Sequence, residues 1–131
     1  MTREDKNLLL KDLCARLPYG VKCRYHHIQD IINSKIIDIS MFGRVNIDGH
    51  IKDVCDIKPY LFPLSSMTEE QKKEYWSLVW FDGLSAGWNR DDAVILNEVE
   101  MLIDFYHKNH LDWRGVIEKG LAIDATGLNI Y

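Results

Sequence analysis

The fold depends on one stretch near the middle of the chain, Ile57-Lys58-Pro59-Tyr60-Leu61-Phe62-Pro63-Leu64-Ser65-Ser66-Met67. Pro59 and Pro63 each fix a φ angle and lack a backbone N–H, so the stretch predicts neither a helix nor a central strand. Its apolar side chains are too many for a solvated linker. We therefore expect an extended crossover that packs on the core, with Tyr60, Leu61 and Phe62 buried. It separates a strand-rich half of the chain from a helical half.

The residues at the start of the chain have the pattern of an amphipathic helix that begins near Thr2. The Thr2 side chain can accept a hydrogen bond from the Asp5 amide, a common N-terminal cap. Pro18-Tyr19-Gly20 ends the helix. The apolar stripe consists of Leu9, Leu10, Leu13, Cys14 and Leu17. The polar face, which we expect in water, carries Lys6, Lys11, Asp12 and Arg16.

Four strands are expected between this helix and the central stretch. Residues 21–25 and 44–47 alternate apolar and polar side chains, the period of a half-buried strand. Residues 31–40 contain five isoleucines. Asp48-Gly49 predicts a tight hairpin turn that leads into residues 51–57. Because short turns join these strands, the sheet should be an antiparallel meander.

Helices dominate the second half of the chain. Thr68 followed by Gln71 predicts a helix start of the capping-box type, and this helix should end near residues 82–83. A second helix is expected to start at Asn89 or Asp91 and to run to about residue 107, and residues 121–123 could add a short strand to a sheet edge. The predicted fold is α+β, one domain over residues 1–131. An antiparallel sheet of about four strands would be packed by the N-terminal helix and these two helices.

Composition narrows the function classes. The chain has 131 residues, 47% apolar and 27% charged, and a net charge of −4. That acidic balance argues against nucleic-acid binding, which usually requires a basic stripe. Apolar runs fall well short of the ~20 residues of a membrane helix, and we expect a cytosolic protein with reduced thiols. Cys14 and Cys23 should be small buried side chains.

Two patterns could carry catalysis. His107 and His110 have a spacing that can ligate zinc on one helix face, which would suit a metal-dependent hydrolase, although histidines at a helix C-terminus also interact with the helix dipole. Ser85, within residues 83–87, satisfies Gly-x-Ser-x-Gly by its letters. The nucleophile elbow requires a strand before the serine, and a helix is expected there instead. We therefore expect no enzyme, no cofactor and no bound metal.

The tryptophans provide the best candidates for a binding surface. Trp76 and Trp80, at helical spacing, are expected in the core. Trp88 and Trp113 are expected in loops, each followed within two positions by an arginine. The predicted binding surface consists of Trp88, Arg90, Trp113 and Arg114. Tryptophan and arginine are the usual composition of an interface hot spot.

Three blocks of the sequence resemble one group of proteins. They are residues 12–21, 58–71 and 109–122, which include Leu17-Pro18-Tyr19-Gly20, Lys58-Pro59-Tyr60-Leu61-Phe62-Pro63 and Leu111-Asp112-Trp113-Arg114-Gly115. Together they resemble small uncharacterised proteins of phages and of integrated elements of gut anaerobes, a group with no assigned activity. The resemblance implies a phage or prophage accessory protein in the cytoplasm of a bacterial host.

Three hypotheses of function follow. The first is a non-enzymatic phage protein that binds a host protein, including a defence factor. The second is a binder of a small anionic ligand such as a nucleotide signal, with charge from Arg24, Arg44, Arg90 and Arg114. The third is the metal-dependent hydrolase around His107 and His110. The apolar last residues and the loop tryptophans are also compatible with a homo-oligomer.

Overall fold

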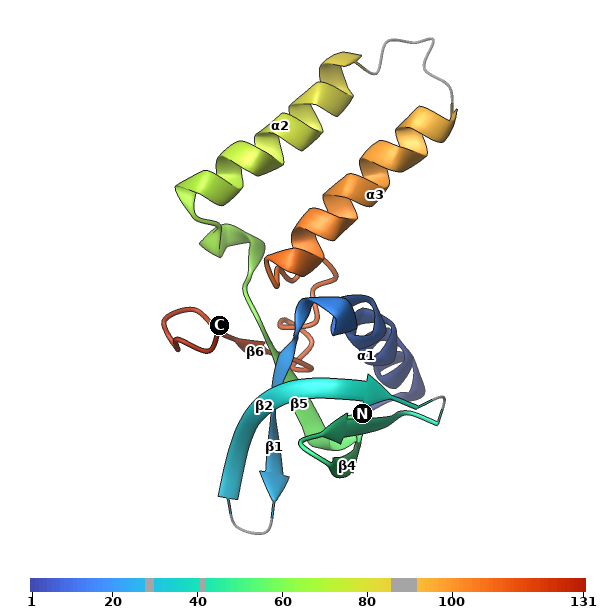
Figure 1. The fold of residues 1–131 in the computed structure, drawn as a ribbon, viewed down its shortest axis with the longest axis vertical. Coiled ribbons are helices and arrows are strands. Elements are labelled where there is room, and N and C mark those ends of the chain that lie inside the picture. The colour runs from blue at the N-terminus through green and yellow to red at the C-terminus, as the bar shows by residue number, and fades with distance from the viewer. Residues whose placement is uncertain (28–29, 41, 86–91) are drawn as a thin grey trace.

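The computed structural model describes residues 1–27, 30–40, 42–85 and 92–131 (Figure 1). It confirms an α+β fold. The described residues form a six-stranded mixed sheet in the order β4-β3-β2-β1-β5-β6, together with three α-helices and short 3-10 turns. The sheet therefore has two strands more than expected, and one of its pairings is parallel.

Helix α1 (Arg3–Arg16) begins as predicted. The Thr2 Oγ1 accepts a hydrogen bond from the Asp5 amide at 3.0 Å. Leu9 and Leu13 are completely buried, and they pack with side chains of β1 (Lys22–His27) and β3 (Arg44–Ile47) in the main core. Burying such leucines contributes about 1.5–3 kcal/mol each.

Strands β1, β2 (Asp30–Ile39), β3 and β4 (His50–Asp53) form the expected antiparallel meander. A register shift between Ile36 and Asp38 bends β2 against β3. Asp48 and Gly49 both have positive φ values, 52° and 81°, as a two-residue hairpin turn requires. The structure confirms these features, and the sequence could predict them because each depends on residues close together in the chain.

The first five residues of the central stretch form a strand, contrary to prediction, and a 3-10 turn (Leu64–Ser66) follows. A 3-10 turn (Val54–Asp56) leads directly into β5 (Ile57–Leu61), which pairs antiparallel with β1 and parallel with β6 (Ile123–Asp124). Pro59 is tolerated because β6 pairs only with Tyr60 and Leu61, so Pro59 has a strand partner on one side only among the described residues.

Burial of the central stretch is confirmed for two of three side chains. Tyr60 and Leu61 are 1% and 0% exposed, whereas Phe62 is half-buried. β6 confirms that the chain after residue 120 returns to the sheet edge. The β5–β6 pairing brings the last part of the chain against its middle.

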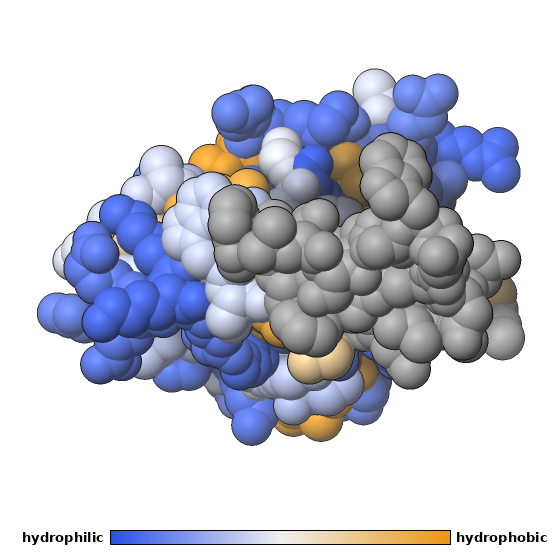
Figure 2. All heavy atoms as spheres, turned by 90° about the horizontal axis from the view of Figure 1, so that it is seen from above, coloured by the Kyte–Doolittle hydropathy of each residue, from blue (hydrophilic) through white to orange (hydrophobic). Residues whose placement is uncertain are grey.

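Helices α2 (Glu69–Ser85) and α3 (Asp92–Lys108) form an antiparallel pair that extends away from the sheet (Figure 1). The expectation that both pack on the sheet was wrong, and α2 runs past the expected end. Thr68 and Gln71 form the predicted capping box, each backbone amide donating to the other side chain. Figure 2 looks down on this end of the molecule, where most described residues are hydrophilic.

Exposure departs from the helical pattern at several of the described positions. Cys14 is exposed instead of buried, and Trp76 is 57% exposed instead of lying in the core. Conversely, Asp12 and Arg16 are fully buried instead of facing water. The pattern correctly identifies a polar face on α1. The part of this face at Asp12 and Arg16 is covered by the segment that follows α3. Within the described ranges, no helix has the length and apolar character needed to cross a membrane.

Candidate functional site

The predicted binding surface is only partly within the described residues. Trp88 and Arg90 lie outside them. Trp113 and Arg114 follow α3, and both are half-buried. The Arg114 guanidinium lies over the Trp113 ring, 4.3 Å from its centroid, a cation–π contact.

Trp113 belongs to a continuous series of aromatic rings, which we call the aromatic row: Trp76, Tyr75, Tyr106 and Trp113. The Trp76 and Tyr75 rings on α2 meet edge to face at 5.5 Å between centroids. Tyr75 lies 6.4 Å from Tyr106 on α3, and Tyr106 stacks on Trp113 at 6.0 Å with an angle of 17° between the rings. Trp76 is 57% exposed and the other three rings are half-buried. The row therefore reaches the surface at Trp76.

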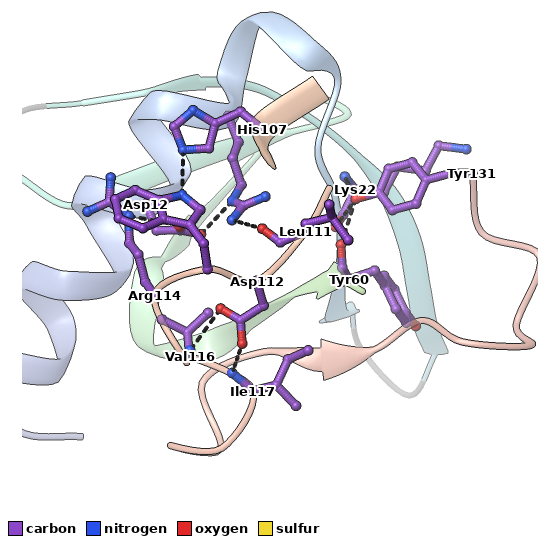
Figure 3. A network of polar contacts seen from close by, with 12 residues as sticks. Asp12, Lys22, Tyr60, His107, Leu111, Asp112, Arg114, Val116, Ile117 and Tyr131 are labelled. Atoms are coloured by element: carbon purple, nitrogen blue, oxygen red, sulfur yellow. Dashed lines mark hydrogen bonds and ion pairs between the residues drawn. The ribbon is translucent and has the colours of Figure 1, made fainter. Parts of the chain in front are cut away.

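A buried group of charged side chains, the polar junction, lies next to Trp113 (Figure 3). Its members are Asp12 and Arg16 of α1 with Arg114 and the Leu111 carbonyl. The Arg16 Nε donates to Asp12 Oδ2 at 2.8 Å, and Arg16 Nη2 donates to the Leu111 carbonyl at 2.6 Å. Arg114 Nε lies 3.1 Å from Asp12 Oδ1 without hydrogen-bond alignment, so this contact is a charge pair. The junction fixes the segment after α3 on α1.

Hydrogen bonds to α3 and inside the segment after α3 order the region around Trp113 (Figure 3). The Trp113 Nε1 donates to His107 Nε2 at 3.0 Å. The Asp112 carboxylate accepts from the backbone amides of Val116 and Ile117, each at 2.9 Å. The indole ring is therefore fixed by its own N–H, and the following turn is closed by Asp112.

The two histidines of the metal hypothesis have other contacts. His107 Nε2 must be unprotonated to accept from Trp113, and burial and then the Arg16 charge lower the pKa of His107. His110 stacks on Tyr131 with ring centroids 3.7 Å apart. Burial, then the charges of Arg16 and Lys22, lower the His110 pKa to about 4. Among the described residues, no three or more His, Cys, Asp or Glu side chains are grouped to hold a metal ion.

The last residue of the chain docks on β1 and the central stretch through its side chain. The Tyr131 hydroxyl accepts from the Lys22 amide at 2.9 Å and donates to the Tyr60 carbonyl at 2.8 Å (Figure 3). Burial raises the pKa of Tyr131 to about 12. The ring thus connects β1, the central stretch and His110.

The arginines expected around an anionic ligand are separated in space. Arg114 pairs with Asp12, Arg44 is exposed on β3, and Arg90 lies outside the described residues. Arg24 lies in a pocket of about 520 Å³ where β5 begins. The charged and titratable side chains of this basic pocket are Arg24, His26, Lys52, Asp56 and Lys58.

The sequence alone did not reveal Lys52 and Lys58 as neighbours of Arg24. Alternation along β1 puts Arg24 and His26 on one face, and this signal was available. Arg24 is opposite Lys58 on β5. This pairing could not be predicted, because Pro59 and Pro63 led us to expect no strand there. The aromatic row was missed for a similar reason, since it joins α2, α3 and the segment after α3.

The Gly-x-Ser-x-Gly match lacks the surroundings of a nucleophile elbow. Helix α2 runs through Ser85, so a helix precedes this position where the elbow requires a strand. Ala86 and Gly87 lie outside the described residues.

Comparisons with protein-family models, with curated proteins and with solved structures find no match to this chain. The resemblance to small phage proteins therefore stays a prediction. The aromatic row, the polar junction and the basic pocket are the features from which function can be inferred.

Proposed function

We propose that this protein is a non-enzymatic accessory protein of a phage or prophage that binds a host protein through the aromatic row and Arg114. The observation that supports it most is the continuity of the row, which runs from exposed Trp76 to Trp113 beneath the Arg114 guanidinium. The phage context comes from the sequence resemblance, and it favours a host defence protein in the bacterial cytoplasm as the partner.

The chemistry of the row suits a protein partner. Interface hot spots are enriched in tryptophan, tyrosine and arginine, and a few such residues supply most of the binding energy. Trp76 is a large apolar side chain that remains 57% exposed, and burying it would recover favourable apolar contact. Val99 and Met101 of α3 are also exposed, by 43% and 55%.

The surroundings of the row reduce the cost of binding. Trp113 is fixed by its hydrogen bond to His107, and Arg114 is held by Asp12. Side chains that are already ordered lose less conformational entropy when a partner covers them. The polar junction therefore acts as a rigid base for the binding surface.

The test is recovery of host proteins from a bacterial lysate by purified wild type and by a Trp76→Ala variant. Trp76 is exposed, so its removal should leave the fold intact. Loss of a hot-spot residue costs about 2 kcal/mol or more, so we expect recovery of a specific partner to fall more than tenfold.

Phe42→Ala is the matched control, because Phe42 is an aromatic side chain that is 80% exposed on the turn between β2 and β3. It should retain every partner. Equal recovery of all partners by wild type, Trp76→Ala and a Trp113→Phe variant would contradict the proposal.

A further inference from the structure

The basic pocket gathers positive charge on an acidic protein. Arg24, Lys52 and Lys58 line it against the single carboxylate of Asp56, so the lining is positive even with His26 neutral. The whole chain carries a net charge of −4. A local concentration of cations in a concave site raises the local concentration of anions regardless of the net charge.

Two of the pocket cations face each other directly. Arg24 on β1 and Lys58 on β5 are register partners in the antiparallel pair. Like charges in opposed positions destabilise a sheet. Within the described part of the chain, neither Arg24, Lys52 nor Lys58 forms an ion pair with a carboxylate. The described residues therefore leave a net positive charge in the basic pocket.

Arg24 is held in a defined orientation. Its Nε donates to the Tyr60 hydroxyl at 3.0 Å, and its guanidinium lies 5.6 Å from the centroid of the Tyr60 ring. Tyr60 is 1% exposed, and its own hydroxyl donates to Asn33 Oδ1. Because only Nε is used, the two terminal nitrogens can donate to a ligand as a fork.

Lys52 is also placed against an aromatic ring. Its ammonium lies 5.9 Å from the centroid of the Tyr25 ring, which belongs to the core. Two of the three cations are thus oriented by tyrosines before any ligand arrives, which lowers the entropy cost of binding.

The geometry points to a binding site for a phosphate dianion in the basic pocket, with Arg24 and Lys58 contacting its oxygens and Lys52 supplying further charge. A phosphate group carries about −1.5 to −2 near neutral pH, which matches several converging cations better than the single charge of a carboxylate. The pocket volume of about 520 Å³ exceeds that of the phosphate alone. Ile57 and Cys55 supply apolar lining, so a small organic group on the phosphate also fits.

The test is titration calorimetry at low ionic strength with inorganic phosphate, with adenosine monophosphate and with cyclic adenosine monophosphate, a diester of single charge. We expect either or both of the first two to bind, and the diester to bind at least about tenfold more weakly because it lacks the second charge. Equal binding of phosphate and the monophosphate would identify the phosphate as the whole ligand. Tighter binding of the monophosphate would identify a monoester.

Variants locate the site. Arg24→Gln and Lys58→Gln should each weaken binding at least about tenfold, because each removes a charge-assisted hydrogen bond. Lys58 is exposed, so the second variant stays informative if the first unfolds. Arg44→Gln and Lys73→Gln are matched controls, since they change the net charge equally at exposed positions outside the pocket, and they should alter binding less than about twofold.

Four results would overturn the inference, and the first three concern the small ligands and the variants. They are an absence of binding by phosphate and by the monophosphate, equal binding of the diester, and equal losses in Arg24→Gln and Arg44→Gln. Binding of a single-stranded oligonucleotide without either small phosphate would also overturn it and would identify a nucleic-acid surface. A Trp76→Ala variant should bind phosphate as tightly as wild type does, because Trp76 does not line the basic pocket. This result would show that the two sites are independent.

Discussion

The polar junction and the basic pocket are built from the same kinds of side chain in opposite arrangements. In the junction, the Asp12 carboxylate lies between Arg16 and Arg114, and Arg16 also donates to the Leu111 carbonyl. In the pocket, Arg24 and Lys58 oppose each other, and Asp56 is the single carboxylate among the lining residues. In the first arrangement both cations are paired with one carboxylate, whereas in the second no cation is paired with a carboxylate among the described residues.

This difference indicates what each region is for. A buried ion pair is costly to desolvate, so it is weak evidence of added stability but strongly fixes which segments meet. The junction thereby specifies that the segment after α3 returns to α1. Unpaired cations on an open surface give no such specificity, and holding them together costs free energy that a bound anion would recover.

The largest effect is expected from breaking the junction. Asp12→Ala leaves Arg16 buried and without its charge partner, which should lower the free energy of unfolding by about 3–5 kcal/mol in urea titrations. Glu4→Ala, which removes a carboxylate from an exposed position of the same helix, should change it by less than about 1 kcal/mol. An Asp12→Leu, Arg16→Met double variant should recover part of the loss, because no fully buried charge remains unpaired, while Arg114, which is 13% exposed, still loses its partner. Comparable stability of Asp12→Ala and wild type would show that the junction does not hold the fold.

An intermediate effect is expected from acid, because His110 is buried and lies near the positive charges of Arg16 and Lys22. The His110 pKa is lowered to about 4, so the folded state favours the neutral ring. Stability from this residue is complete above its unfolded pKa of about 6.5 and is lost as the pH falls towards 4. Thermal unfolding measured across this window should show that the melting temperature falls as the pH is lowered from 6.5 to 4.

His110→Asn is the comparison for the acid effect. Asparagine tolerates the positive φ of 57° at this position and has no charge to gain. The fall in melting temperature between pH 6.5 and 4 should be smaller than in wild type. An identical fall in both proteins would assign the acid sensitivity to other groups.

The smallest effect is expected from the pocket. Lys58→Gln removes one of two opposed cations, so the ligand-free protein should become more stable by about 0.2–1 kcal/mol at low salt. The gain should fade as salt screens the charges. A loss of stability would mean that Lys58 has a compensating partner and would remove the contrast with the junction. Lys73→Gln on α2 provides the baseline for loss of an exposed lysine.

The sequence by itself determined the features that depend on near neighbours. The Thr2 cap, the Thr68–Gln71 capping box and the Asp48-Gly49 turn each form between residues no more than three positions apart. The strand over residues 44–47 follows from its own alternation, and the α+β class follows from the order of such segments. Local backbone preferences and short-range hydrogen bonds contain the information for all of these.

Tertiary structure alone decided the features that join distant segments. Asp12 and Arg16 look like solvent-facing residues until Arg114 and the Leu111 carbonyl cover them. Pro59 argues against a strand with neighbours on both sides. Only the structure shows that the pairing of β5 with β6 starts at Tyr60, one residue after Pro59. Arg24 meets Lys58, and Tyr75 meets Tyr106, only through strand register and helix pairing. Hydrophobic periodicity identifies which face of an element is apolar, but it does not identify what will lie against a polar face. The polar junction and the basic pocket are both built on such faces.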